Sequence, residues 1–215
     1  MPIIKFPLTF YIVVLLNVVL LNGCTSIIKT ESPVVSVNLS LAEDGKVLPI
    51  NYTLTLPPEH LVGTVTTQLI EVNFAGKNQQ FIAQIEYSKD QIALVGVSTT
   101  GIPLFDVVWR SDAPIILNEY VPLPNLKVEF IIADIQWTHW PLEQLKSSVV
   151  GDNISIVEKN VPETLTDTGL ILWKRQLLQN NQIILEVNKF ENYFQLEHKL
   201  RNYSIKITPL NKDKK

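Results

Sequence analysis

The sequence contains a single cysteine, Cys24, and only 8 glycines in 215 residues. One cysteine cannot form an intrachain disulfide, and it excludes a zinc site built from several cysteines. Charged residues make up 18% of the chain, the formal net charge is −3, and no basic block is present. Because contacts to phosphate dominate the affinity for nucleic acids, a slightly acidic chain of this kind is not expected to bind DNA or RNA.

Apolar side chains, in contrast, are abundant: 46% of the residues are hydrophobic, and the mean hydropathy is +0.17. This composition excludes a disordered chain. Part of the excess lies in residues 6–21, an uncharged stretch that follows Lys5. The stretch is shorter than the roughly 20 apolar residues that span a bilayer. A charged start followed by a short apolar core is typical of a secretory signal peptide, which we predict for residues 1–23.

The end of this stretch, Leu21-Asn22-Gly23-Cys24, resembles the bacterial lipobox, in which a small residue precedes an obligatory cysteine. The resemblance implies cleavage after Gly23 and attachment of lipid to Cys24. Thr25 permits export to the outer membrane in bacteria that use Asp at this position to retain lipoproteins. Two or more acyl chains suffice for stable anchoring. The predicted location is therefore the periplasmic side of the outer membrane, and an uncleaved N-terminal anchor helix is the alternative.

The remainder of the chain is long enough to bury one core. We predict that residues 24–45 form a lipidated tether with room for one short strand, that residues 46–210 form the folded domain, and that residues 211–215 form a charged tail. Alternation of apolar and polar residues predicts strands throughout the domain. These strands are 61–74, 81–87, 92–97, 102–110, 113–119, 154–160, 165–167, 170–178, 182–190, 193–198 and 203–208. The short turns between them favour antiparallel pairing.

Residues 124–149 break this alternation. Val128, Ile131, Ile132 and Ile135 recur at helical spacing, and Pro141 suits the first turn of a second, short helix. The first helix is apolar on much of its circumference and should be buried widely. The predicted fold is mainly β (α+β): an antiparallel curved sheet, or open half-barrel, with a helical hairpin covering its concave face.

The patterns that point to catalysis are weak. His60, His139 and His198 lie far apart, and none has metal-ligand spacing, so surface or locally hydrogen-bonded histidines are expected. Residues 96–101 read GxSxxG, one residue longer than a nucleophile elbow, and are predicted to form a turn. Asp134 is either a buried acid or, as we favour, a solvent-facing or capped residue. We predict no enzymatic activity, no catalytic residue, no metal and no cofactor.

The large apolar side chains are better candidates for a binding site. Trp137 and Trp140 flank His139, while Trp109 and Trp173 lie in predicted strands. These residues can fill the core, or some of them can line an apolar cleft, since ligand clefts are lined mainly by hydrophobic and aromatic side chains. The candidate ligand-binding residues are Trp109, Phe130, Ile131, Ile135, Trp137, Trp140 and Trp173.

Residues 133–141, ADIQWTHWP, look like the "DLQLxYWP" signature of a family of bacterial lipoproteins of unknown function. Genes of that family often accompany aryl-polyene and fatty-acid-like biosynthesis clusters. Residues 92–105 are similar to the family's "LxLvglsxxGxxLF" hairpin, and residues 203–207 resemble its "YxLxIxTL" tail. With Leu56-Pro57-Pro58, the resemblance covers about residues 55–210. The family usually has an Asn-x-x-x-Tyr pattern near its C-terminal strands. This chain departs from that pattern, because Tyr203 follows Asn202 directly.

The family is similar to the outer-membrane lipoprotein receptor LolB, and more distantly to the carrier LolA. This resemblance implies a half-barrel with helices on its concave face, an acyl chain bound in the cavity, and a LolA-like periplasmic carrier as partner. LolB's membrane-inserting loop would correspond to the turn at residues 100–103, with Ile102 at its tip.

Two functions follow from these observations. The first is a membrane-anchored lipoprotein that binds a lipid or an acyl- or polyene-type molecule and helps deliver it to the outer membrane. The second is a non-catalytic structural or scaffolding lipoprotein with a closed core. An apolar cavity favours the first function and a filled core favours the second. A hydrolase or transferase has no supporting set of residues.

Overall fold

Strands account for 58% of the structure, a computed structural model, and they form one large antiparallel sheet that is curved and not closed into a barrel. The structure describes residues 35–39, 49–122, 127–166 and 169–210, all within a compact unit of residues 32–215. The predicted signal peptide, Cys24, most of the tether and the charged tail lie outside the described residues. The predicted mainly β fold with an open curved sheet is confirmed.

Ten strands form the large sheet in the order β7-β6-β5-β4-β3-β13-β12-β11-β10-β9. Their bounds are β3 Thr64–Phe74, β4 Lys77–Tyr87, β5 Gln91–Val97, β6 Pro103–Arg110, β7 Ile116–Glu119, β9 Ile154–Thr166, β10 Gly169–Gln179, β11 Gln182–Phe190, β12 Phe194–His198 and β13 Tyr203–Pro209. Each strand of this sheet except β9 and β7 has two antiparallel neighbours, and the sheet's first and last strands along the chain pair with each other, β3 with β13. A 3₁₀ helix, η1 (Glu59–Leu61), precedes β3.

Tight turns of the predicted kind connect neighbouring strands. Ala75 and Gly76 join β3 to β4, and Asn180 and Asn181 join β10 to β11, all four with positive φ. Two successive residues with positive φ suit the type I′ turn, whose twist matches that of the strands it connects. The turns therefore fix the antiparallel register on both halves of the sheet.

Residues 98–101 of the GxSxxG segment form the predicted turn between β5 and β6, while Gly96 and Val97 end β5. Gly101 has a φ of 86°, a conformation that favours glycine. A Cβ atom at Gly96 would lie 2.4 Å from Cε1 of the Phe105 ring on the neighbouring strand. The hydroxyl of Ser98 accepts a hydrogen bond from the backbone N–H of Ile102 at 2.9 Å. These residues serve the hairpin, and nothing in their geometry resembles a nucleophile elbow.

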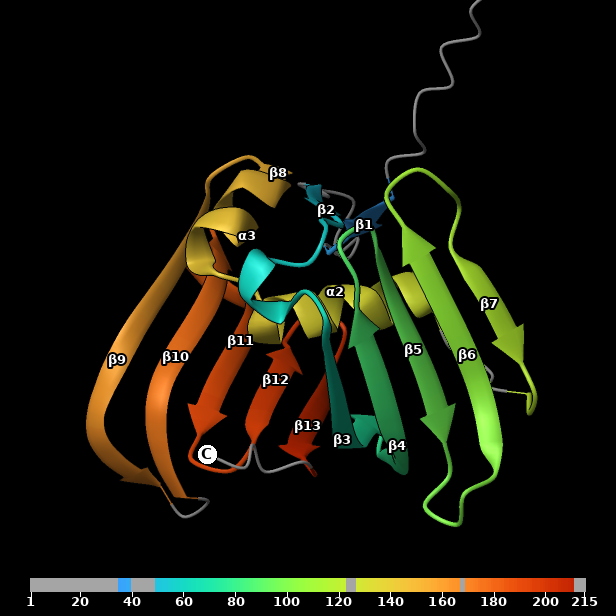
Figure 1. Ribbon diagram of the computed structural model, residues 1–215. Coiled ribbons are helices and arrows are strands. Elements are labelled where there is room, and N and C mark those ends of the chain that lie inside the picture. The colour runs from blue at the N-terminus through green and yellow to red at the C-terminus, as the bar shows by residue number, and fades with distance from the viewer. Residues whose placement is uncertain (1–34, 40–48, 123–126, 167–168, 211–215) are drawn as a thin grey trace, which may run out of the picture. The chain divides into compact units, whose positions relative to one another are not determined.

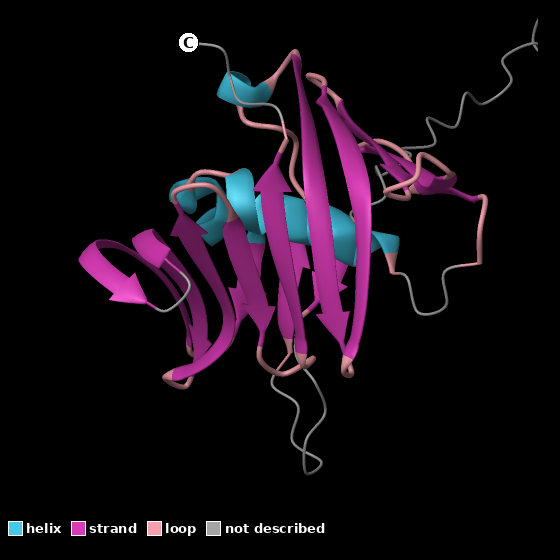
Figure 2. Ribbon diagram, turned by 90° about the horizontal axis from the view of Figure 1, so that it is seen from below, coloured by secondary structure: helices cyan, strands magenta, loops and turns pink. Residues whose placement is uncertain are grey.

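The helix α2 (Val128–His139) lies across the hollow of the large sheet, as Figures 1 and 2 show. It ends where Pro141 follows Trp140, and α3 (Leu142–Ser148) continues the chain. Seven consecutive residues of α2, from Ile132 to Thr138, are buried. The wide burial that its apolar pattern predicts is therefore present.

A second, small sheet explains how α2 is covered on the side that faces away from the large sheet. It has the order β1-β2-β8, with β1 Ser36–Asn38, β2 Ile50–Thr53 and β8 Val149–Gly151. The phenol of Tyr52 in β2 donates a hydrogen bond to Gln136 Oε1 in α2 at 2.6 Å. The Gln136 amide in turn donates to the carbonyl of Thr55 at 2.9 Å. The buried polar face of α2 is thus satisfied by a segment about 80 residues away in the sequence.

Candidate functional site

The structure divides the seven candidate ligand-binding residues into two groups. Trp109, Ile135, Trp137 and Trp140 are each at most 5% exposed and belong to the core. Phe130, Ile131 and Trp173 are partly exposed and pack against the edge of that core. The first group fills the core, and only the second can meet a ligand without a rearrangement of the fold.

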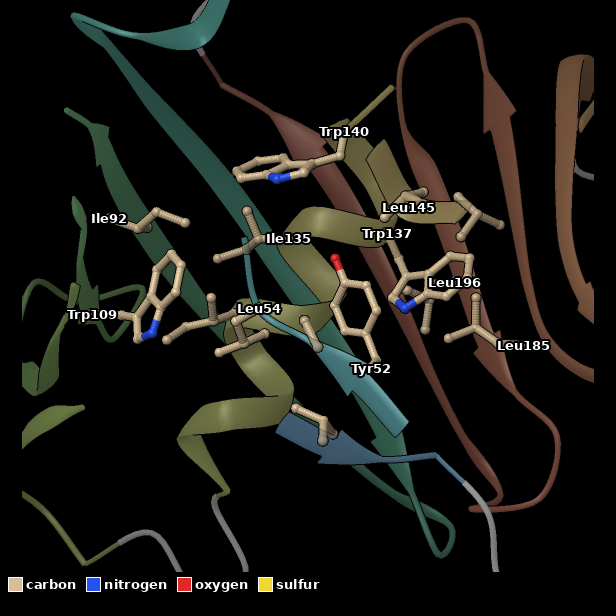
Figure 3. Close-up of a cluster of buried hydrophobic side chains, with 14 of the residues drawn as sticks. Tyr52, Leu54, Ile92, Trp109, Ile135, Trp137, Trp140, Leu145, Leu185 and Leu196 are labelled. Carbon is tan, nitrogen blue, oxygen red and sulfur yellow. The ribbon is translucent and has the colours of Figure 1, made fainter. Parts of the chain in front are cut away.

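The buried tryptophans fill the centre of the concave side of the large sheet (Figure 3). The ring centroids of Trp137 and Tyr52 lie 5.6 Å apart, and those of Trp140 and Tyr87 lie 6.0 Å apart. Trp109 pairs across strands with Ile92. Burial of such large aromatic surfaces dominates the energetics of a core, so this packing is expected to hold α2 against both sheets.

Three side chains form a row across β10, β11 and β12 on the concave face. Trp173 lies opposite Lys189, and Lys189 lies opposite Phe194. Directly opposed residues share one face of a sheet, and Phe194 continues the row to the core residue Ile207. The Lys189 ammonium lies 4.0 Å from the centroid of the Phe194 ring. Trp173 meets the same ring edge-on at 6.1 Å.

His139, the last residue of α2, packs against this row. Its ring centroid is 5.2 Å from that of Phe194. Its Nε2 is 3.2 Å from the amide nitrogen of Gln68, and its Nδ1 is 3.1 Å from the carbonyl oxygen of Ile135. These contacts suit a neutral ring that donates to the carbonyl and accepts from the amide. Burial, with a smaller contribution from the nearby charge of Lys189, lowers the pKa of His139 to about 4.

Arg175 joins the end of α2 to the large sheet. Its Nη1 donates to the carbonyl of Trp137 at 2.7 Å, and its Nε donates to the carboxylate of Glu158 at 2.8 Å. The guanidinium also lies 5.0 Å from the centroid of Trp173. Burial lowers the pKa of Arg175, while the Glu158 carboxylate opposes that shift. Arg175 therefore positions both Trp173 and the helix end.

Asp134 is buried, so the favoured prediction of a solvent-facing or capped residue is wrong. The phenol of Tyr203 in β13 donates to its two carboxyl oxygens at 3.0 and 3.2 Å. Burial raises the pKa of Asp134 to about 7, although the Tyr203 hydrogen bond and the charge of Arg201 lower it. The Arg201 guanidinium lies 3.8 Å from the Phe130 ring centroid. This cluster fixes the first half of α2 to the sheet.

His198 is also buried, beside Tyr203, at a distance of 5.4 Å between ring centroids. Burial, with a smaller contribution from the charge of Arg201, lowers its pKa to about 3. Its Nδ1 accepts a hydrogen bond from the backbone N–H of Arg201 at 3.3 Å. His60 is exposed, so the three histidines occupy different environments.

Ile102 lies at the tip of the β5–β6 hairpin and is 57% exposed. It borders a surface pocket of about 630 Å³ on the outer side of β5 and β6. The pocket is lined mainly by apolar side chains, among them Val95, Ile102, Val108, Tyr120 and Val121. The Tyr120 phenol donates to the carboxylate of Asp106 there. A second pocket of about 570 Å³ is polar and lies over β3, β4, β12 and β13.

Among the residues that the structure describes, no group of three or more His, Cys, Asp or Glu side chains could hold a metal ion. In the same part of the chain, no helix combines the length and the apolar character needed to cross a bilayer. What the described geometry offers is an aromatic and basic surface on the concave face and an apolar pocket on the outer side.

Comparison with known proteins places the chain in a family. Residues 65–211 match the family model described as a protein of unknown function, DUF3261. The chain belongs to the DUF3261 family. The match runs from β3 to β13 and includes α2. Curated proteins yield no match to this DUF3261 chain.

One solved structure similar to this DUF3261 chain is a DUF1329 family protein from Desulfovibrio piger. The two are 10% identical, the alignment covers 68% of this chain and 83% of the other, and the TM-score is 0.27.

Several residues of the concave surface do not follow from the sequence. Lys189, Phe194 and Arg175 lie in correctly predicted strands, but only the strand pairing brings them together. Gln68 and His139 are 71 residues apart and meet through the docking of α2. The one usable signal is the alternation within residues 182–190, which places Leu185, Val187 and Lys189 on one face.

Proposed function

We propose that this DUF3261 protein is an outer-membrane lipoprotein that binds a lipid or an acyl- or polyene-type molecule and helps deliver it to the membrane. The observation that carries the proposal is the partly exposed aromatic surface on the concave face of an open sheet. Trp173 and Phe194 offer adjoining rings there, and Phe130 and Ile131, in the first turn of α2, are also partly exposed. Hydrophobic transfer onto such a surface yields about 25 cal/mol per Å² of apolar area buried.

Delivery needs an anchor and a surface that meets the membrane. The lipobox at Cys24 supplies the first, and the exposed Ile102 on its hairpin supports the second. The similarity to LolB adds a soluble LolA-like carrier as the partner that brings the molecule. No covalent chemistry is required, because the molecule moves between apolar environments.

Replacing Trp173 by aspartate is expected to reduce binding of a fluorescent fatty acid at least tenfold. The change places a charge where an apolar chain would lie, and it removes the apolar area that the indole ring would bury against that chain. Leu172→Asp is the matched control, since Leu172 is 42% exposed and neighbours Trp173 in β10. Native mass spectrometry of protein purified without added lipid provides the second measurement. If wild-type protein carries no lipid and binds no fatty acid, the proposal fails.

Cys24→Ala is expected to abolish acylation and release the protein from the outer-membrane fraction. Each CH₂ of an acyl chain that is buried in the bilayer contributes about 0.8 kcal/mol to the free energy of membrane binding, and loss of the acyl chains removes this contribution. Metabolic labelling with palmitate and membrane fractionation check the result. Labelled, membrane-bound Cys24→Ala protein would show that the anchor is elsewhere.

The filled core favours a second candidate, a structural lipoprotein that links the outer membrane to a periplasmic partner. Trp109, Trp137 and Trp140 are at most 2% exposed, so the centre of the hollow is occupied by the chain's own side chains. This function predicts that Trp173→Asp and Leu172→Asp behave alike in every ligand assay. The two candidates therefore separate in the same experiment.

A further inference from the structure

Lys189 differs from Lys174 and Lys206, two lysines on other strands of this half of the sheet. Lys174 in β10 pairs with Glu186 at 3.4 Å, and Lys206 in β13 pairs with Glu71 at 3.2 Å. Lys189, in contrast, forms no ion pair with any residue that the structure describes. Its ammonium lies over the Phe194 ring on the concave face and is only partly exposed. The charge is thus held in a partly desolvated place without a carboxylate.

The neighbours of Lys189 include a second cation, which is paired, and a neutral imidazole ring. Arg175 lies over Trp173, the residue opposite Lys189, and His139 packs against Phe194 on the other flank. The charges of Lys189 and Arg175 both contribute to the lowered pKa of His139. The carboxylate of Glu158 is paired with Arg175, with 2.6 Å between Oε2 and Nη2. One full positive charge therefore remains uncompensated beside two aromatic rings.

Partial burial also lowers the pKa of the Lys189 ammonium, since water is removed and no anion takes its place. An anion bound there would restore the lost stabilisation, because charge-assisted hydrogen bonds are stronger than neutral ones. The rings of Trp173 and Phe194, 6.1 Å apart, would at the same time accept an apolar chain. The site thus offers a partner for each part of an anionic amphiphile: a cation for the head group and two aromatic rings for the apolar chain.

We infer that Lys189 receives the anionic head group, a carboxylate or a phosphate, of a single-chain amphiphile whose apolar chain packs on Trp173 and Phe194. The inference rests on the proposed lipid-binding function and gives that function a head-group preference. Arg175 is a positioning residue, since its guanidinium is committed to Glu158 and to the Trp137 carbonyl. Lys189 is the group that touches the ligand.

The test compares two probes with the same fluorescent polyene chain, parinaric acid and the corresponding neutral alcohol. Wild-type protein is expected to bind the acid about tenfold more tightly than the alcohol, as one charge-assisted hydrogen bond provides. Lys189→Met should abolish this preference while the affinity for the alcohol changes less than about twofold. Lys189→Arg keeps the charge and should keep the preference. A hexadecyl phosphate competitor distinguishes a phosphate from a carboxylate head group.

Lys206→Met is the matched control, because Lys206 also lies over an aromatic ring, that of Tyr193 at 5.1 Å, but is exposed and paired with Glu71. It should behave as wild type. Equal binding of acid and alcohol by wild-type protein would overturn the inference and leave the proposed function standing, as would equal effects of Lys189→Met and Lys206→Met. Absence of binding for both probes would overturn the proposed function itself.

Discussion

Replacing Trp137 by alanine is expected to lower the free energy of unfolding by about 3–5 kcal/mol, the usual cost of truncating a buried tryptophan. Trp137 is 0% exposed, and its ring packs against Tyr52 of the small sheet. Its indole N–H has no hydrogen-bond partner among the described residues, so the loss is one of packing alone. Urea unfolding followed by circular dichroism measures the change.

Trp173→Ala is the matched control for this prediction. It removes the same side chain from a partly exposed position, so less apolar area returns to water and the cost should be distinctly smaller. Equal destabilisation by the two substitutions would contradict the division into core and concave surface. A cost below about 1 kcal/mol for Trp137→Ala would mean that the hollow is loosely filled, since large cavities in packed cores cost more.

Asp134→Asn is expected to change the pH dependence of stability and to stabilise the protein at neutral pH. The folded-state pKa of Asp134, about 7, lies above its unfolded value of about 3.9. The stability due to this group is therefore fully present below about pH 4 and is lost as the pH rises through 7. At about 1.4 kcal/mol per pKa unit, the loss is on the order of 4 kcal/mol. Asparagine keeps the shape, accepts the Tyr203 hydrogen bond and carries no charge.

His139 and His198 act in the opposite direction. Their folded-state pKa values of about 4 and about 3 lie below the unfolded value of about 6.5, so their contribution is complete above that pH and is lost as the pH falls. In wild-type protein, Asp134 offsets part of the rise in stability between about pH 4 and 6.5. In Asp134→Asn the free energy of unfolding should rise more steeply with pH and should reach a plateau above about pH 6.5. Parallel stability curves for the two proteins from pH 4 to 8 would show that Asp134 does not titrate in this range.

The strands and α2 could be predicted because their signal is local. Alternation of apolar side chains with period 2 marks a half-buried strand, and recurrence at helical spacing marks α2 within a few residues of its observed bounds. The strands β2 and β8 escaped prediction, since three or four residues are too few to establish a period. The predicted runs 154–160 and 165–167 are one continuous strand, β9.

The environment of individual side chains could not be predicted, because it depends on partners far along the chain. Asp134 is buried because Tyr203, 69 residues away, satisfies its carboxyl oxygens. Trp137 is buried because β2 covers α2 on the side away from the large sheet. The pairing of β10, β11 and β12 alone places Lys189 between Trp173 and Phe194. The pattern of apolar and polar residues separates the side chains that face the core from those that face outward. The register of the strands and the docking of α2 decide which of the inward-facing side chains stay partly exposed.

We propose that the concave face, rather than the outer pocket beside Ile102, holds the apolar chain of a bound molecule. A fatty acid with a photoreactive diazirine in its chain tests this most directly, with the covalent adducts mapped by peptide mass spectrometry. We expect adducts on β10 and β12 around Trp173 and Phe194 and on α2, and we expect Trp173→Asp to remove them. Adducts confined to β5 and β6 around Val95 and Ile102, or no adducts at all, would contradict this proposal.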